Sequence, residues 1–236
     1  MLSTFRTGGP GSRVVVLYRL REGDLMVMQA RAVRTRQSLV QAAAELFAAE
    51  GYARASLPVI SERAGVSTGA LHFHFASKSD LAGEVERAAA DSVEELAQRC
   101  RSAADTLLQS LVHTACGLLL AVVTDPVIRA GFRLSGDPSR KNGAQMLQWW
   151  RAWVHDLIVQ AQREGELAQD VSVDAATTVI VAATAGFEVL GAADRDWLSV
   201  ERVTQLWTFL LPWLAGSPDH APLLSGIGEA LDELSE

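Results

Sequence analysis

The chain has few cysteines and no long apolar runs. Cys100 and Cys116 are the only cysteines among 236 residues, too few for a disulfide framework or a cysteine metal cluster. Both lie in apolar, helix-like stretches, where cysteine behaves as a small buried side chain. The longest apolar runs, such as residues 118–123, are far too short to cross a bilayer. These shortages exclude a disulfide-stapled secreted domain and predict a cytoplasmic protein with no membrane span.

The N-terminal region lacks the features of a signal peptide. Its short apolar run, residues 14–18, is surrounded by charges, and no small-residue cleavage site follows it. Met26 and Met28 come immediately before the first stretch with a clear helical pattern. We expect residues 1–28 to be either a disordered arm or a non-native extension upstream of the true start; the sequence leaves both open.

The residue patterns of the common enzyme classes are also missing. There is no Ser/His/Asp order, no metal-spaced cluster and no glycine-rich phosphate loop. His72 and His74 are two residues apart and do not share a helix face, so they are not expected to bind a metal together. We predict a protein that is not an enzyme and that needs neither metal nor cofactor.

The net charge of −7 is divided unevenly along the chain. Residues 1–30 carry +2, residues 31–78 carry +3 and residues 79–236 carry −12. Phosphate binding needs a local basic face, and the remaining chain is free to repel DNA. An ordinary acidic protein with uneven charge fits the same numbers, so charge permits nucleic-acid binding without indicating it alone.

Apolar residues recur at helical spacing throughout, and no alternating run predicts a strand. Gly51, Gly65 and Gly165 mark helix ends, because a residue without Cβ adopts the left-handed conformation at low cost. Ser77 and Asp80 have the spacing of a capping box. The expected helices span about 31–50, 56–64, 67–74, 77–100, 107–122, 126–134, 147–161, 174–192 and 199–214, with a short one from about 219.

This pattern predicts an all-α fold in two parts. Residues 29–76 would form a three-helix DNA-binding head, and residues 77–236 a larger helical body for ligand binding and dimerisation. With 49% apolar residues, the chain has enough to bury a core in both. The polar segment 135–143 is expected to be a loop.

Residues 56–75 have the pattern of a helix-turn-helix. Ser56 is expected to cap the first short helix, and Gly65 to form the turn. The second helix opens with Ser67-Thr68-Gly69-Ala70, whose small side chains let its N-terminus approach a duplex. A glycine-turn helix pair is by itself more often structural than DNA-binding.

Basic residues lie on both sides of this segment. Arg31, Arg34 and Arg36 crowd the start of the first helix and could follow the DNA backbone or enter a minor groove. Lys78, at the start of the next long helix, suits a phosphate contact. An arginine cluster alone is usually solvated, but these features in this order favour a DNA-binding head.

Three short motifs lie within residues 31–80. They are Ala42-Ala43-Ala44-Glu45-Leu46-Phe47 with Gly51-Tyr52, Ile60 followed by Ala64-Gly65-Val66, and Gly69-Ala70-Leu71 followed by His74-Phe75 and Lys78. They resemble the N-terminal domain of the tetracycline-repressor (TetR) family. The resemblance implies a homodimer that lays one short helix of each subunit in a major groove, and a ligand pocket in the body. By position, the implied DNA contacts are Arg34, Thr35, Arg36, Ser56, Ser67, Thr68, Gly69, Leu71, His72, His74 and Lys78.

Two of these positions depart from the family pattern. Members often carry Lys where this chain has Thr68, and Tyr where it has His72. The departures put the operator sequence in doubt, although they leave operator binding intact.

The body carries a narrower resemblance. Its motifs are the run from Asp125 to Leu134, Trp150-Arg151, Gly165-Glu166-Leu167, and the run from Asp170 to Asp174. They resemble the γ-butyrolactone autoregulator receptors of streptomycete-type actinomycetes, which repress antibiotic biosynthesis until a signalling lactone releases them. Look-alikes called pseudo-receptors answer instead to antibiotics or their intermediates, and His72 favours the look-alikes slightly.

A ligand site in the body would be built on aromatic side chains. Trp150 falls where the family's ligand-contacting tryptophan would be, and it shares a helix face with Trp153. An indole N–H suits a ligand carbonyl, while Trp149 or Trp153 could equally be core. A buried Glu188 would need a partner. The predicted ligand set is Phe132, Trp150, Trp153, Thr184, Phe187 and Glu188.

Helices 174–192 and 199–214 are apolar enough to form a subunit interface as well as a core. Small residues between 182 and 186 permit close helix approach, so we expect a four-helix interface about a two-fold axis. The predicted function is a ligand-released repressor in which the helix 77–100 acts as a lever on the head. A transcriptional activator, or a small-molecule-binding protein with a degenerate head, are the alternatives.

Overall fold

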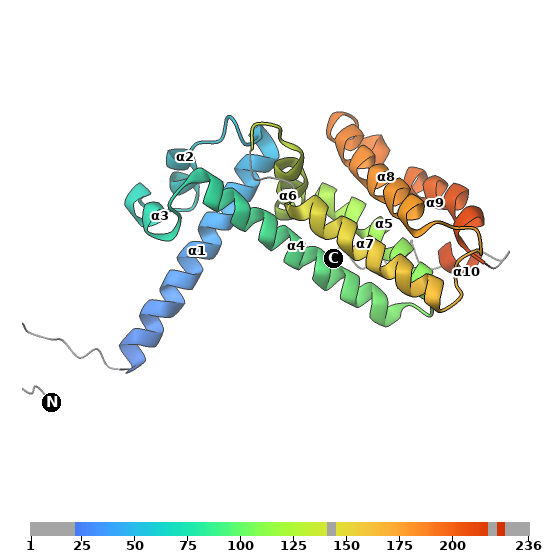
Figure 1. Cartoon of the computed structure of the whole chain (residues 1–236). Coiled ribbons are helices and arrows are strands. Elements are labelled where there is room, and N and C mark those ends of the chain that lie inside the picture. Colours follow the sequence, from blue (N-terminus) through green and yellow to red (C-terminus); the bar gives the residue numbers. More distant parts are fainter. Residues whose placement is uncertain (1–21, 141–144, 217–220, 225–236) are drawn as a thin grey trace, which may run out of the picture.

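The computed structural model describes residues 22–140, 145–216 and 221–224, and within them the predicted all-α fold is confirmed (Figure 1). An isolated antiparallel bridge pairs Leu167 with Ala215. The helices are α1 (Glu22–Glu50), α2 (Leu57–Arg63), α3 (Thr68–His74), α4 (Lys78–Ala103), α5 (Leu107–Thr124), α6 (Pro126–Gly136), α7 (Gln145–Arg163), α8 (Val173–Ala193), the 3-10 turn η1 (Arg195–Leu198), α9 (Val200–Leu214) and α10 (Ala221–Leu224).

Local signals in the sequence account for most of the helix ends. Gly51, Gly65 and Gly165 have φ values of 79°, 68° and 78°, the left-handed conformation predicted for them. The Ser77 side chain accepts a hydrogen bond from the amide of Asp80 at 3.1 Å, as a capping residue should. These ends therefore depend on residues within a turn of each helix.

Ser56 is a correction among the expected caps. It occupies the cap position of α2 in an extended conformation, but its side chain makes no capping hydrogen bond. Pro58 lies in the first turn and has no N–H, which removes one of the amides that a serine cap would bind.

Two hydrophobic cores are connected by α4 and α6. The head core joins α1, α2 and α3 to the start of α4, and it also takes in Ala130 and Leu134 of α6. The body core includes Ile128 and Phe132 from the same helix. Gly131 brings α6 close to α4, because a Cβ built on it would lie 2.4 Å from the Cβ of Ala89. A movement of α4 or α6 would therefore change the packing of both cores.

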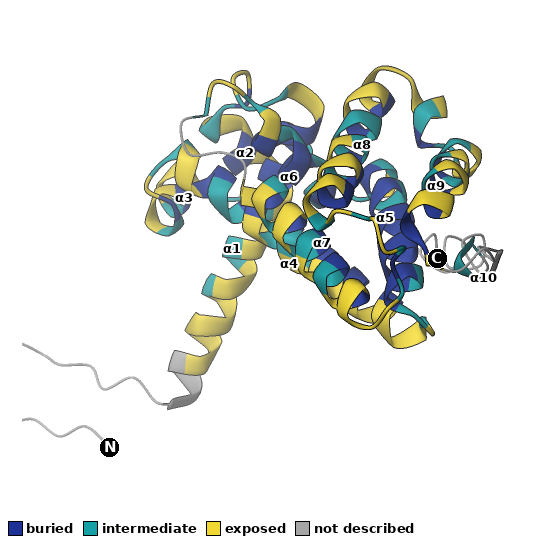
Figure 2. Ribbon diagram, turned by 45° about the vertical axis from the view of Figure 1, so that its right-hand side comes forward, coloured by how far each residue is buried: buried dark blue, intermediate teal, exposed yellow. Residues whose placement is uncertain are grey.

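Helix α5 forms the centre of the body, and α8 lies at its surface (Figure 2). Both are long and apolar enough to cross a membrane by length and composition alone, but their burial differs. About 72% of the α5 segment is buried inside the body, which identifies it as a core helix, whereas 33% of the α8 segment is buried. Helix α8 therefore presents apolar side chains at the surface of the isolated chain.

Both cysteines are buried, as expected. Burial raises the pKa of Cys116 to about 12 and also raises the pKa of Cys100. Both side chains are thus neutral thiols at physiological pH, in keeping with a packing role.

Several boundaries differ from the predictions. Helix α1 begins at Glu22, so residues 22–28, expected to belong to a disordered or non-native extension, are helical. Ser135 belongs to α6 and is buried, although it was expected to begin a loop; its hydroxyl finds a buried acceptor that a sequence pattern cannot reveal. The turn η1 was not predicted. The helix expected from about 219 lies partly outside the described residues, which contain α10.

Candidate nucleic-acid interface and effector region

Helices α2 and α3 are joined by a tight turn whose geometry is fixed by buried side chains. Ile60 of α2 and Leu71 of α3 are completely buried in the same head core. At the turn, the amide of Val66 donates to the carbonyl of Ser61 at 3.0 Å, next to the left-handed Gly65. The pair therefore has a fixed crossing, which a helix-turn-helix needs in order to present one helix.

The N-terminus of α3 is capped and exposed. Ser67 accepts a hydrogen bond from the amide of Ala70 at 3.1 Å. Thr68 and Gly69 are exposed beside it, and a Cβ on Gly69 would meet nothing nearer than the Ser67 hydroxyl at 3.8 Å. A helix N-terminus with small, exposed side chains suits close approach to phosphates and base edges.

The exposed face of α3 contains an aromatic ring that the sequence analysis missed. Phe73 is 83% exposed, although phenylalanine is usually buried. Its ring lies edge-on to His74, with centroids 5.3 Å apart, while His72 next to it is also exposed. Two large exposed side chains therefore follow the small N-terminal turn. The signal in the sequence was available, since Leu71 and Phe75 already supply the apolar positions of this short helix.

Leu71 is a correction to the predicted DNA contacts. Its side chain is fully buried in the head core, so it cannot touch DNA. Its role is to hold α3 against the rest of the head, as the apolar position of an amphipathic helix does.

Lys78 also differs from its prediction as a phosphate ligand. Its ammonium donates to the carbonyls of Tyr52 and Ala55 at 2.7 and 2.8 Å, and lies 4.4 Å from the centroid of the Tyr52 ring. Burial lowers the pKa of Lys78. In this structure the side chain stabilises the loop after α1, and a phosphate contact would require it to give up these carbonyls.

The predicted basic residues of α1 have different environments. Arg36 forms an ion pair with Glu84 of α4, and its guanidinium lies over the Phe75 ring at 5.1 Å. The hydrogen bond raises the pKa of Arg36 and lowers that of Glu84. Arg34 is exposed and makes no ion pair with any described residue. Of the two arginines, Arg34 is therefore the one whose charge is available to DNA, whereas Arg36 connects α1 to α4.

A buried ion pair lies where the head meets the body. Arg140 and Glu86 are 2.7 Å apart, and both side chains are almost completely shielded from solvent. The other Glu86 oxygen accepts hydrogen bonds from the Ser135 hydroxyl at 2.7 Å and the Gln145 amide at 3.2 Å. The Arg140 guanidinium also lies 5.4 Å from the centroid of the Tyr52 ring in the head. The network therefore joins α4, α6 and α7 to the loop after α1.

The predicted ligand residues do not all meet in one place. Trp150 is fully buried, stacked on Trp153 with ring centroids 5.2 Å apart, and belongs to the same core as Phe132. Phe187 lies edge-on to Trp197. The Trp150 indole nitrogen is buried with no acceptor among the described residues.

The two polar members of the predicted ligand set lie on α8. The Thr184 hydroxyl donates to the Ile180 carbonyl at 2.9 Å within its own helix. Glu188 lines a small cavity of about 160 Å³ together with Arg129 and Arg133. Burial raises the pKa of Glu188, and the nearby Arg133 opposes that rise. The Arg133 guanidinium donates to the Ala48 carbonyl, so Arg133 acts on Glu188 as a nearby charge, and no ion pair or hydrogen bond joins the two.

Taken together, the capped helix pair and the helical body define a DNA-binding transcriptional regulator. Residues 39–85 match the family described as bacterial regulatory proteins, tetR family, and residues 105–215 match a tetracyclin repressor-like C-terminal domain. The chain belongs to the TetR family of regulators.

Individual relatives within the family include receptors for signalling molecules. The A-factor receptor protein of Streptomyces griseus is 32% identical over 80% of this chain and 67% of its own length. The transcriptional repressor BepR of Brucella suis is 28% identical over 74% of this chain and 85% of its own. The crystal structure of a γ-butyrolactone receptor (ArpA-like protein) matches with a TM-score of 0.70 and 29% identity, covering 86% of this chain and 99% of that one.

A further solved structure contains DNA. CprB from Streptomyces coelicolor, in complex with its biological operator sequence, matches with a TM-score of 0.70 and 28% identity over 86% of this chain and 99% of that one. The named relatives are transcriptional regulators and γ-butyrolactone or A-factor receptors, and none of them is an enzyme.

Proposed function

We propose that this protein is a ligand-responsive repressor that binds operator DNA as a homodimer and is released by a small, largely apolar signalling molecule. The observation that carries the proposal is the exposed, capped N-terminus of α3 on a head whose core shares α4 and α6 with the core of the helical body. A head that shares helices with the body allows a ligand to change DNA binding, because each state of the body favours one placement of the head.

The proposed DNA contacts come from α3 and the residues around it. Thr68, Gly69 and His72 would reach base edges in the major groove, and Phe73 would add an apolar contact. Backbone contacts would come from Arg34, Thr35, Ser56, Ser67 and His74. Leu71 is left out because it is buried.

The proposed dimer interface is the exposed apolar surface of α8 and α9. Val179 and Val189 of α8 and Phe209 and Trp213 of α9 are exposed although they are large and apolar. A cavity of about 610 Å³ lies between the two helices on this surface. Exposed apolar surface of this kind marks an interaction site, and a second copy of the same two helices would cover it as a four-helix interface.

The proposed effector region includes the stacked tryptophans of α7. A buried indole N–H without an acceptor is rare in native proteins, and a ligand carbonyl would supply one at Trp150. The A-factor receptor and the γ-butyrolactone receptors among the relatives support a signalling lactone or an antibiotic intermediate as the effector. A related structure described as a basis for control of antibiotic production supports antibiotic biosynthesis as the regulated process. Binding to chromosomal DNA would place the protein in the cytoplasm.

Operator binding is tested by a gel-shift titration with the promoter DNA of the neighbouring gene. Arg34→Gln should weaken binding and reduce the salt slope by about one, because one phosphate contact is lost. Arg101→Gln, the same change at the far end of α4, is the matched control and should bind like the parent. The proposal fails if the parent protein does not shift this DNA at any salt concentration tested.

Effector release is tested by adding culture extract to the same complex. Trp150→Ala should keep operator binding and lose release, and Trp150→Phe, which keeps an aromatic ring but removes the N–H, should weaken release. Trp207→Phe is the control, since the Trp207 indole nitrogen is likewise buried without an acceptor among the described residues but Trp207 lies outside the predicted ligand set. If culture extract releases the Trp150 variants from operator DNA as readily as it releases the parent protein, the effector assignment is wrong.

A further inference from the structure

The first two amides of α7 are held by side chains of other helices. The Gln145 amide donates to the Glu86 carboxylate of α4, and the Met146 amide donates to the Ser135 hydroxyl of α6, both at 3.2 Å. Ser135 in turn donates to the same Glu86 oxygen at 2.7 Å. The first amides of a helix have no partner within that helix, so they need acceptors of this kind. A displacement of the start of α7 would therefore move or break its bonds to Glu86 and Ser135.

Glu86 connects this cluster to Arg140. The other oxygen of its carboxylate lies 2.7 Å from the Arg140 guanidinium, and both side chains are buried. The same guanidinium nitrogen donates to the Leu134 carbonyl of α6 at 3.0 Å. A buried cation must keep its partners, because an uncompensated charge is costly away from water. The position of the Arg140 side chain therefore depends on the position of Glu86.

In the head, Arg140 meets the ring of Tyr52. The Arg140 Cζ lies 5.4 Å from the centroid of this ring, within the range of a cation–π contact. The ring packs on the head core beside Phe47, with the two centroids 5.9 Å apart. Tyr52 belongs to the short loop between α1 and α2. A change at its ring therefore acts on the segment that leads into the helix-turn-helix.

Two further cations hold the same part of the head. Arg133 of α6 donates to the Ala48 carbonyl in the last turn of α1, and Figure 1 shows this end of α1 beside α6. Lys78 of α4 donates to the Tyr52 carbonyl at 2.7 Å. Among the described residues, the hydrogen bonds of these two side chains all go to the head. Arg140 differs from them because its carboxylate partner also binds the start of α7.

We propose that Arg140 is a positioning residue through which α7 sets the placement of the helix-turn-helix, and that the Tyr52 ring is its contact in the head. A displaced α7 would pull on Glu86, Arg140 would follow, and the loop before α2 would be held less firmly. Trp150 lies on α7 five residues after Gln145. An effector bound at Trp150 would therefore act on this path, and this last step rests on the proposed function.

The test is hydrogen exchange of the full chain without DNA, measured by mass spectrometry. Ser135→Ala removes the hydroxyl that joins Glu86 to the start of α7. The amides of residues 51–63 should then exchange about 2-fold to 5-fold faster, the effect of losing one cation–π contact, because Arg140 would hold the Tyr52 ring less firmly. The change is measured relative to the amides of α5, which report the general stability of the body.

Substitutions of Tyr52 show whether its ring is the contact in the head. Tyr52→Leu should give at least the same increase in exchange, whereas Tyr52→Phe, which keeps a ring, should exchange like the parent. In the double variant Ser135→Ala/Tyr52→Leu the increase should be no larger than in Tyr52→Leu, because the path to the loop is already broken. Ser102→Ala, the same change on the exposed end of α4, is the matched control and should have no effect.

Two results contradict the proposal: unchanged exchange of residues 51–63 in Ser135→Ala, or additive increases in the double variant. The first result decides even if Tyr52→Leu does not fold, because Ser135→Ala leaves the head intact.

Gel shifts with culture extract separate this inference from the proposed function. Tyr52→Leu should need about 2-fold to 5-fold more extract than the parent for half-release from operator DNA. If it needs the same amount, the contact has no part in release. A parent protein that never binds DNA refutes the proposed function alone, since the exchange experiment contains no DNA.

Discussion

At the scale of single residues, the exposed and buried faces of α3 divide the work of the head. Leu71 is buried and fixes the helix, whereas Phe73 is 83% exposed on the opposite side. An exposed phenylalanine has no packing role in the free protein, so its removal should leave stability unchanged. This separates it from Leu71, whose loss would create a cavity in the core.

Phe73→Ala should lower operator affinity without changing the melting temperature. We expect a loss of about 1 kcal/mol or more, roughly 5-fold to 10-fold, since an apolar contact with a thymine methyl or sugar would be removed. Fluorescence anisotropy with operator DNA measures the affinity, and Val59→Ala on the exposed side of α2 is the control. Unchanged affinity would remove Phe73 from the interface.

Lys78 should act mainly on stability. Lys78→Met removes the ammonium that donates to the Tyr52 and Ala55 carbonyls, and leaves these acceptors to water. We expect a loss of about 1–3 kcal/mol in urea unfolding. The salt slope of operator binding should stay the same, because no phosphate contact is lost; a slope reduced by about one would restore Lys78 as a phosphate ligand.

At the scale of elements, α4 is fixed to its neighbours by two different kinds of ion pair. Near the head, Glu84 pairs with Arg36 of α1 and with Arg87 of α4, in partly exposed positions. Two residues further along α4, Glu86 pairs with Arg140, and both side chains are buried. We expect the first pair to make stability depend on pH, and the second to hold α4, α6 and α7 together.

The Glu84 pair should make stability depend on pH. The hydrogen bond from Arg36 holds the pKa of Glu84 below its ordinary value, so its stabilisation is present above the pKa of the unfolded carboxyl group. It is lost as the pH falls through the folded pKa. Urea unfolding should show Glu84→Gln to be less stable than the parent at pH 7, with the difference shrinking toward pH 3. A difference that does not change with pH would contradict this explanation.

Breaking the buried pair should cost more. Arg140→Met leaves Glu86 buried without its cation, a change that typically costs about 3–5 kcal/mol. The double variant Glu86→Gln/Arg140→Met removes both charges and should recover part of that loss in urea unfolding. No recovery would show that Arg140 stabilises the protein through the Tyr52 ring instead.

At the scale of the whole molecule, the proposed function requires two heads at a fixed separation. The proposed interface, on α8 and α9, lies on the body, whereas the DNA contacts lie on the head (Figure 1). In the proposed dimer, the interface would therefore set the spacing of the two α3 helices, which must be about 34–36 Å for neighbouring major grooves. Weakening the dimer should weaken DNA binding without any change in the head.

Phe209→Asp should convert the dimer to monomers, because a charge would be buried at the centre of an apolar interface. Sedimentation velocity should give a smaller species than the parent, and operator affinity should fall with it. Gln148→Asp, the same charge change on the exposed part of α7, should leave both unchanged. A Phe209→Asp protein that sediments like the parent would place the interface elsewhere.

The sequence by itself determined the features that act over a few residues. Helical spacing of apolar residues predicted the helices, and Gly51, Gly65 and Gly165 ended them with the expected left-handed backbone. Ser77 was recognisable as a cap because a cap bonds to an amide only three residues away. The position of the helix-turn-helix followed from the same local signals, whereas its DNA-binding role was inferred from the flanking basic residues and the resemblance to the TetR family.

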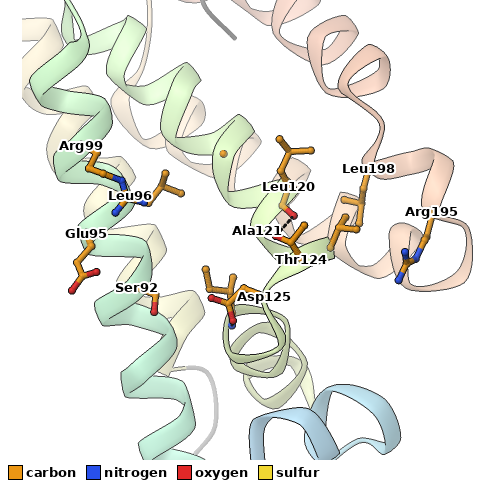
Figure 3. A pocket seen from close by; sticks show the side chains of 13 residues that line it. Ser92, Glu95, Leu96, Arg99, Leu120, Ala121, Thr124, Asp125, Arg195 and Leu198 are labelled. Atoms are coloured by element: carbon orange, nitrogen blue, oxygen red, sulfur yellow. Dashed lines mark hydrogen bonds between the residues drawn. The ribbon is translucent and has the colours of Figure 1, made fainter. Parts of the chain in front are cut away.

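Tertiary structure decided which of these side chains are available. Lys78 is bound to carbonyls 23 and 26 residues away, and Arg36 is bound to a carboxylate 48 residues away. A cavity of about 410 Å³ takes its walls mainly from α4, α5 and η1, and η1 is an element that the sequence pattern did not predict (Figure 3). Pairings over such separations depend on how the helices pack, since packing alone brings these groups into contact, and no periodicity in the sequence records it.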